Sequence, residues 1–212
     1  MMRRTAHEAL HDSGRAAAAP PDEWRLFVAI DVGAAAREVL RAAQARCQRE
    51  GFPLRPVDPA GAHLTLRFLG ATDPAHVPAL GAALRAVAAN QTAFVLHTAA
   101  PGVFPNAARA RVLWLGLTGP LARLAALQEA TEAALLGCGV PRETRPFAPH
   151  LTIGRVADTP GPTAARTAAL LAALPVVAAP LPVTAIHLLR STLAPGGARY
   201  TTLLTALLRD RA

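Results

Sequence analysis

The sequence contains no lysine: all 22 of its basic residues are arginine, and with 14 acidic residues they give a formal net charge of +8. Without lysine the protein cannot be a Schiff-base enzyme, a P-loop nucleotidase or a ligase that is adenylated on a lysine. The arginine excess favours anionic partners, because guanidinium groups pair bidentately with phosphate and a basic surface attracts nucleic acid. The composition therefore favours phosphate-bearing ligands and excludes ATP-dependent ligation through lysine.

Cysteine is also scarce. Cys47 and Cys138 are the only two, they are far apart, and neither belongs to a Cys-x-x-Cys pair. A zinc site or a redox motif is therefore not expected, and two free thiols in a reducing cytoplasm are the simplest interpretation. The five histidines outside the motifs described below show no ligand spacing such as His-Glu-x-x-His, so we expect no metal and no cofactor.

Long uninterrupted apolar runs are missing as well. The least charged stretch, residues 167–189, is broken by Pro175, Pro180 and Pro182 and cannot form one membrane-spanning helix. The N-terminal residues include arginines but lack the apolar h-region of a secretory signal. The sequence therefore predicts a cytoplasmic protein with no membrane partner.

Two copies of a four-residue pattern are the most informative feature that is present. They are His63-Leu64-Thr65-Leu66 and His150-Leu151-Thr152-Ile153, whose histidines are 87 residues apart. Successive side chains of a strand point to opposite faces, so each histidine shares a face with the threonine two residues later. The same alternation predicts that Leu64, Leu66 and Phe68 enter a core. A repeated polar pair on apolar strands indicates one site built from two related halves.

The chemistry available to such a site is restricted. Two imidazoles can divide the work of acid and base at neutral pH, because an unperturbed histidine titrates near pH ~6.5. One takes a proton from an attacking water while the other donates a proton to a leaving oxygen. Threonine hydroxyls can donate hydrogen bonds to anionic oxygens. The pattern therefore indicates metal-independent phosphodiester hydrolysis, and acyl transfer fits less well because no recognisable serine or cysteine nucleophile motif is present.

The rest of the chain predicts one folded unit with a tail. Residues 1–23 are polar and alanine-rich and end near Pro20-Pro21, which predicts a flexible N-terminal tail. The single domain spans residues 24–212, with helices expected near 34–48, from 73 onward, and near 120–136 and 163–174. Strands are expected near 24–30, 63–69, 94–99, 110–117, 150–156, 183–189 and 199–207. This order is a rough duplication and predicts an α+β monomer of two pseudo-symmetric lobes, each a mostly antiparallel sheet backed by helices, with both motifs in a central cleft.

Several segments resemble the 2H phosphoesterase superfamily, and within it the RNA 2′,3′-cyclic phosphodiesterases, also called 2′-5′ RNA ligase or LigT-like proteins. The resemblance covers nearly everything from Trp24 onward and is carried by both motifs with their flanking residues, 62–70 and 147–155. Further similar segments are the opening strand, residues 25–30, the run Val112-Leu113-Trp114-Leu115, and the final hairpin with Leu189-Arg190-Ser191, Pro195, Gly197 and Tyr200.

The resemblance implies a metal-independent enzyme that opens a terminal 2′,3′-cyclic phosphate on RNA and leaves a 2′-phosphate. It implies His63 as the proton donor to the departing 3′ oxygen and His150 as the proton acceptor from water. Thr65 and Thr152 would bind the non-bridging oxygens. The two histidine roles can be exchanged without violating anything in the sequence. With an RNA 5′-hydroxyl replacing water, the same site would make a 2′-5′ linkage without ATP.

Four further residues are candidates near these motifs. The family pattern implies that Arg155 contacts the phosphate or the base. Arg155 lies five residues after His150, so strict alternation places it on the opposite face, and it needs a β-bulge or the strand end to reach the site. Arg67 shares the face of the first motif by alternation, and we expect it to contact the RNA backbone. Phe147 and Phe104 either stack on a base or pack in the core.

Two alternatives stay open at this stage. The same catalytic pairs would act on another cyclic phosphate, such as ADP-ribose 1″,2″-cyclic phosphate, or on a 2′-5′-linked oligonucleotide, and only the loops decide between these substrates. The second alternative is a non-catalytic protein that binds RNA ends carrying a 2′,3′-cyclic phosphate or a 2′-phosphate. The presence of two intact motifs argues against it, because binding alone does not need both histidines.

Overall fold

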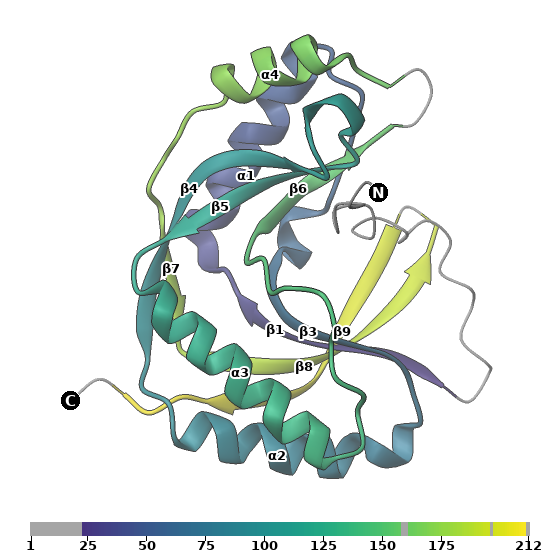
Figure 1. The fold of residues 1–212 in the computed structure, drawn as a ribbon, viewed down its shortest axis with the longest axis vertical. Helices are drawn as coiled ribbons and strands as arrows, with labels where there is room; N and C mark the ends of the chain where they lie inside the picture. The colour runs from purple at the N-terminus through teal and green to yellow at the C-terminus, as the bar shows by residue number, and fades with distance from the viewer. Residues whose placement is uncertain (1–22, 158–160, 196, 211–212) are drawn as a thin grey trace, which may run out of the picture.

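The computed structural model describes residues 23–157, 161–195 and 197–210, whose arrangement is shown in Figure 1. Its strands are β1 (Trp24–Asp31), β2 (Leu54–Pro56), β3 (His63–Thr72), β4 (Phe94–Phe104), β5 (Val112–Thr118), β6 (Leu151–Val156), β7 (Pro180–Val183), β8 (Ala185–Ala194) and β9 (Gly197–Leu207). Its α-helices are α1 (Gly33–Arg49), α2 (Val77–Ala89), α3 (Leu121–Gly137) and α4 (Ala164–Ala173), with 3-10 turns η1 (Pro59–Gly61), η2 (Pro74–His76) and η3 (Ala107–Arg109). The tail predicted for residues 1–23 lies, except for Glu23, outside the described residues.

The strands form two antiparallel sheets. Sheet A has the order β3-β1-β8-β9, and sheet B has the order β2-β6-β5-β4-β7. The α+β class with two antiparallel sheets backed by helices is the predicted one, and it is confirmed. The first motif lies on β3, at one edge of sheet A, and the second lies at the start of β6, inside sheet B.

Helices cover one face of each sheet (Figure 1). Helices α2 and α3 pack against β3, β8 and β9 of sheet A, while α1 packs against β4, β6 and β7 of sheet B. We call these covered faces outer and the opposite faces inner; the inner faces of the two sheets look toward each other. None of the helices in the described residues is long and apolar enough to cross a membrane.

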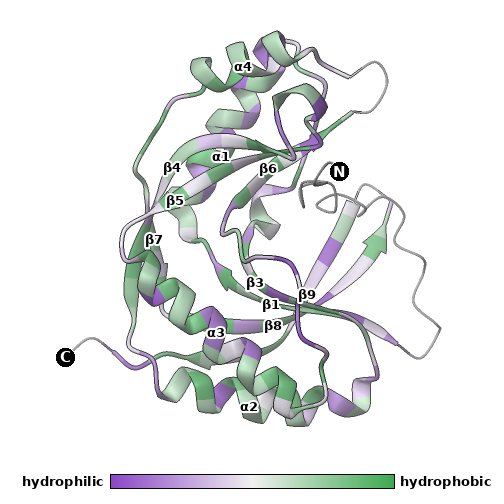
Figure 2. Ribbon diagram, viewed as in Figure 1, coloured by the Kyte–Doolittle hydropathy of each residue, from purple (hydrophilic) through white to green (hydrophobic). Residues whose placement is uncertain are grey.

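Apolar residues fill the space between each sheet and its helices, and Figure 2 shows them as green segments along the strands and helices. Leu80, Leu84 and Val87 of α2 are buried there, as their helical spacing predicts. The turn that leads into α2 starts at Asp73, whose carboxylate accepts a hydrogen bond from the Ala75 N–H at 2.8 Å, followed by Pro74. Local capping and burial thus fix the helix that covers β8 and β9 in the sheet of the first motif.

The two sheets do not correspond to the two halves of the sequence. Helix α1 follows β1 of sheet A but packs on sheet B, and α3 follows β5 of sheet B but packs on sheet A. Sheet A combines strands from both ends of the chain. The rough duplication in the sequence therefore produces two interleaved lobes, and the two motifs still fall on different sheets.

Strands β2 and β7 were not among the predicted elements. Both are short edge strands of sheet B, and both contain proline, which has no N–H for a second neighbouring strand. A run of three or four residues with proline gives no alternating pattern, so tertiary pairing rather than local sequence defines these strands.

Candidate active site

The two motif histidines are held in the same way. The Nδ1 atom of His63 lies 2.8 Å from the carbonyl oxygen of Gly61, and the Nδ1 atom of His150 lies 2.7 Å from the carbonyl oxygen of Ala148. A carbonyl oxygen only accepts hydrogen bonds, so each Nδ1 must carry a proton and donate it. The Nε2 atom of each ring is therefore the one that can accept or donate a proton in a reaction.

Aromatic rings surround both imidazoles. The ring of His63 lies 4.8 Å from that of Phe27 and 4.9 Å from that of Tyr200, measured between centroids. The ring of His150 lies 5.0 Å from that of Phe104 and 6.3 Å from that of Trp114. Tyr200 and Phe104 each meet their histidine edge-on, at 86° and 85°. These contacts restrict the ring orientations and exclude water from the sides of both rings.

This burial lowers the pKa of both histidines. At His63 and at His150 desolvation of the charged ring is the main cause, and the hydrogen bond to the backbone carbonyl partly opposes it. Positive charge on His150 lowers the pKa of His63 further, so the two rings are close enough to interact electrostatically. Such a pair titrates jointly and takes up one proton more readily than two. One protonated and one neutral imidazole are the states that acid–base catalysis requires.

Each motif threonine lies on the inner face of its sheet. Thr65 is opposite Ala29 on β1, and Thr152 is opposite Trp114 on β5. Both threonines are half-buried, whereas the leucine or isoleucine beside each of them is buried in the core. Each sheet therefore presents one imidazole and one hydroxyl on the same side.

A β-bulge in β6 decides where Arg155 lies. The β5–β6 register pairs Leu113 with Gly154 but Trp114 with Thr152, so Ile153 is an extra residue on β6. The bulge reverses the alternation and returns Arg155 to the inner face. Burial raises the pKa of the Tyr200 phenol on β9, and the positive charges of Arg155 and Arg25 oppose that rise. Arg155 on sheet B therefore acts on a side chain of sheet A.

Two residues of the first motif's strand differ from the predicted arrangement. The β1–β3 register pairs Ala29 with Thr65 but Val28 with Arg67, so Leu66 is an extra residue. Arg67 consequently turns to the outer face, where it is 8% exposed and its Nε lies 2.6 Å from Glu132 Oε2 on α3. The prediction that Arg67 shares the face of His63 is wrong, and Arg67 is no longer a candidate for contact with RNA.

The same bulge moves Phe68 in the opposite direction. Predicted to enter the core, Phe68 is instead 55% exposed, and its ring lies 5.9 Å from that of Phe27 on the inner face. The two aromatic residues predicted either to stack on a base or to pack in the core have different surroundings. Phe104 contacts the ring of His150, while Phe147 is half-buried and packs against the hydrophobic core.

Three neighbours of the histidines were not identified as site residues from the sequence, namely Phe27, Trp114 and Tyr200. Phe27 and Trp114 lie on strands whose apolar runs are typical of core positions. Tyr200 comes from the final hairpin, 137 residues after His63, and no local pattern connects the two. The glycine at position 61 makes this approach feasible, because a Cβ there would lie 3.1 Å from the Tyr200 ring.

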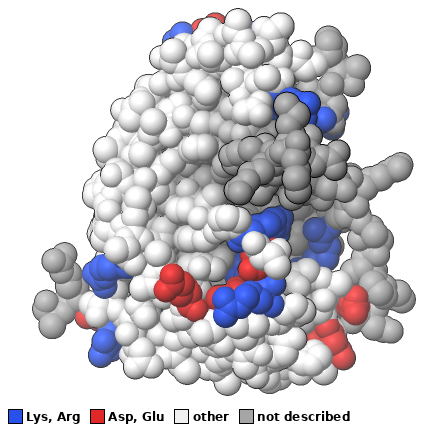
Figure 3. Space-filling model, viewed as in Figure 1, with Lys and Arg blue, Asp and Glu red and all other residues white. Residues whose placement is uncertain are grey.

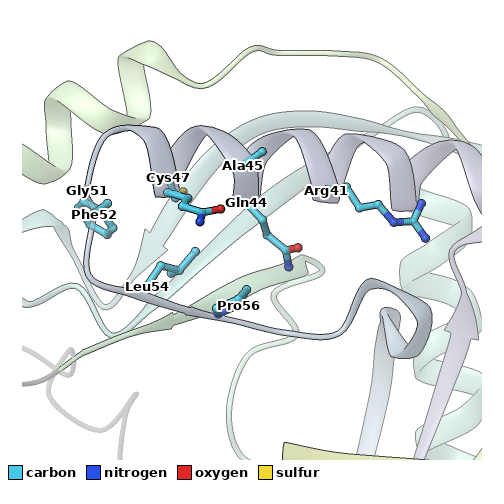
Figure 4. Close-up of a pocket in the computed structure, with 9 residues that line it drawn as sticks. Arg41, Gln44, Ala45, Cys47, Gly51, Phe52, Leu54 and Pro56 are labelled. Atoms are coloured by element: carbon cyan, nitrogen blue, oxygen red, sulfur yellow. The ribbon is translucent and has the colours of Figure 1, made fainter. Parts of the chain in front are cut away.

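A pocket on the outer side of sheet B, shown in Figure 4, lies between α1 and β2. Its lining includes Cys47, whose pKa burial raises to about 11, so this thiol is a poor nucleophile. The pocket contains no histidine. From the same helix, the Gln44 side chain donates hydrogen bonds to the carbonyl oxygens of Val57, at 2.7 Å, and Ile153, at 2.9 Å. We assign the pocket no chemistry and regard Gln44 as a support of the bulge in β6.

Two histidines with available Nε2 atoms, each with a threonine on the same inner face, have the layout of a phosphoesterase that works by acid–base catalysis. The sequence model of the 2′-5′ RNA ligase superfamily matches residues 8–194. The chain belongs to this superfamily.

Curated relatives carry one activity name. The chain is 30% identical over 179 residues to the RNA 2′,3′-cyclic phosphodiesterase of Methanothermobacter thermautotrophicus, a match that covers 84% of this chain and 95% of that protein. It is 34% identical over 137 residues to the Escherichia coli RNA 2′,3′-cyclic phosphodiesterase, covering 63% of this chain and 73% of the relative.

Solved structures agree with this membership. A Thermus thermophilus protein superimposes with a TM-score of 0.73 at 28% identity, over 89% of this chain and 100% of that one. The apo form of E. coli LigT gives a TM-score of 0.68 at 29% identity, over 89% and 99% of the two chains. E. coli LigT has also been crystallised with 3′-AMP, in a structure that matches with a TM-score of 0.66 at 27% identity, over 88% and 98% of the two chains.

Proposed function

We propose that this protein is an RNA 2′,3′-cyclic phosphodiesterase that hydrolyses a terminal 2′,3′-cyclic phosphate to a 2′-phosphomonoester. The observation that carries the proposal is the matched pair His63 and His150, each with its Nδ1 bonded to a backbone carbonyl and its Nε2 available. The activity names of the curated relatives support the same substrate.

In the proposed reaction a water oxygen attacks phosphorus while His150 Nε2 accepts its proton. The bond between phosphorus and the 3′ oxygen breaks, and His63 Nε2–H donates a proton to that oxygen. The product RNA ends in a 2′-phosphate and a 3′-hydroxyl. His150 has gained one proton and His63 has lost one, so the charge of the pair is unchanged. Thr65 and Thr152 donate hydrogen bonds to the non-bridging oxygens, and the Arg155 guanidinium stabilises their negative charge. No metal ion enters any step.

The same site would catalyse ATP-independent 2′-5′ ligation. If an RNA 5′-hydroxyl takes the place of water, its oxygen bonds to phosphorus as the 3′ oxygen leaves. The strained cyclic phosphate is consumed, so no nucleotide cofactor is needed. Which of the two reactions dominates depends on whether water or a second RNA end reaches the phosphorus.

The direct test is incubation of the purified protein, in EDTA, with an RNA that ends in a 2′,3′-cyclic phosphate. Chromatography separates a product that ends in a 2′-phosphate from one that ends in a 3′-phosphate. We expect only the 2′-phosphate, with turnover surviving EDTA and lost in His63→Ala and His150→Ala. A 3′-phosphate product would contradict the proposed bond cleavage. Binding without turnover would instead favour the non-catalytic RNA-end-binding protein, and activity only on other cyclic phosphates or 2′-5′ linkages would change the substrate.

A further inference from the structure

A second arginine lies beside Arg155 on the edge of sheet B. The β2–β6 register places Arg55 directly opposite Arg155 in an antiparallel pair. Residues directly opposite in such a pair have Cβ atoms about 4.5–5.5 Å apart, on the same face of the sheet. The exposed side chains of Arg55 and Arg155 therefore leave the same face of the sheet from neighbouring positions.

The neighbours of Arg55 show independently which face this is. Leu54 and Pro56 both line the pocket beneath α1, on the outer side of sheet B (Figure 4). Side chains alternate along a strand, so Arg55, which lies between them, points to the inner side. The inner side is also where Arg155 and Arg25 act on the Tyr200 hydroxyl. Figure 3 shows arginine side chains in blue at several places on one face of the molecule, with those below its middle beside red carboxylates.

The positive charges of Arg55 and Arg155 lie close together with no negative charge described beside them. Like charges placed directly opposite in a sheet destabilise it, and an anion between them removes that cost. Within the part of the chain that the structure describes, neither Arg55 nor Arg155 forms an ion pair with a carboxylate. By contrast, Arg67 on β3 is paired with Glu132. Arg55, on the strand next to Arg155, thus has an exposed charge that suits the binding of a second phosphate.

Arg55 is farther than Arg155 from Thr152, because it lies on the outermost strand of the sheet. We propose that Arg55 forms a second phosphate subsite beside Arg155, which stays with the reacting phosphate, and that Arg55 binds the internucleotide phosphate on the 5′ side of the terminal RNA nucleotide. This subsite rests on the proposed function, since it presumes that the terminal cyclic phosphate lies between the histidines. It makes the enzyme select oligonucleotide ends over cyclic mononucleotides.

The test compares two substrates that share the reacting group. Uridine 2′,3′-cyclic phosphate has no internucleotide phosphate, whereas the dinucleotide ApU with a 2′,3′-cyclic phosphate has one. Values of kcat/KM are measured for both substrates with wild type, Arg55→Gln and the control Arg85→Gln. Arg85 is an exposed arginine on α2, so its substitution changes the net charge equally without altering sheet B.

We expect Arg55→Gln to lower the dinucleotide-to-mononucleotide ratio of kcat/KM about tenfold, and Arg85→Gln to leave that ratio at the wild-type value. A dinucleotide with a neutral methylphosphonate linkage should lower the wild-type ratio equally, and Arg55→Gln should then cause no further fall. An Arg55→Gln ratio equal to that of wild type would overturn the subsite while the proposed function stands. No wild-type turnover of either substrate would overturn both.

Discussion

The side-chain amide of Gln44, on the outer helix α1, donates a hydrogen bond to the carbonyl oxygen of Ile153, the extra residue in strand β6, which carries the second motif. The other hydrogen of the same amide goes to the carbonyl oxygen of Val57. The bulge at Ile153 decides that Arg155 lies on the inner face. A helix on the far side of the sheet is therefore connected, through one amide, to the arginine assigned to the phosphate.

The first prediction concerns this connection. Gln44→Leu keeps the size of the side chain but removes both donors, which leaves two carbonyl oxygens without these bonds and costs about 1–3 kcal/mol. We expect kcat/KM for the RNA cyclic phosphate to fall roughly tenfold as Arg155 loses its position. In an Arg155→Ala background the same substitution should have little further effect on kcat/KM. Equal effects in both backgrounds would show that Gln44 contributes only to stability.

Arg67 gives the second prediction, on stability rather than on activity. Its guanidinium is buried against Glu132, so Arg67→Ala leaves a carboxylate without its partner and should reduce the free energy of unfolding by about 3 kcal/mol. The control Arg41→Ala removes an exposed partner of Glu38 and should change it by less than about 1 kcal/mol. Both values come from urea unfolding. If Arg67→Ala retains stability and weakens RNA binding instead, its assignment to packing is wrong.

The third prediction follows from the lowered histidine pKa values. His63, His150 and His187 all have pKa values below the ordinary value near ~6.5, mainly because of burial. Between those lowered values and about pH 6.5 the unfolded chain binds more protons than the folded one, so stability should fall as the pH falls through this window. Thermal unfolding at pH 5 to 8 measures the effect. His63→Gln with His150→Gln should flatten the dependence, and an unchanged slope would contradict it.

The sequence predicted the regular parts of the site, and the irregular parts required the structure. Alternation places the threonine of each motif correctly relative to the leucine before it, because the bulge in each strand comes only after the threonine. The extra residue is the fourth residue of each motif, Leu66 in β3 and Ile153 in β6. For Arg155 the need for a bulge could be stated in advance, whereas for Arg67 and Phe68 nothing in the apolar pattern indicates that Leu66 is the extra residue.

Contacts between residues far apart in the sequence could not be predicted from local patterns either. Tyr200 meets His63 because the β8–β9 hairpin belongs to the same sheet as β3, and that pairing depends on the whole topology. The direct pairing of Arg55 with Arg155 similarly depends on β2, a three-residue strand with no alternating signal. Sequence patterns thus indicate the candidate reacting groups, while the packing of the two sheets determines what surrounds them.

The measurement that tests the central claim most directly is the pH dependence of kcat/KM on an RNA 2′,3′-cyclic phosphate, for wild type, His63→Ala and His150→Ala. Wild type should give a bell-shaped profile, because one histidine must be neutral and the other protonated. Each variant should lose roughly 10²-fold or more in rate and one limb of the bell: the acidic limb in His150→Ala, the proposed base, and the alkaline limb in His63→Ala, the proposed acid. Exchanged limbs would exchange the two roles. A bell that persists intact in either variant would contradict two-histidine catalysis.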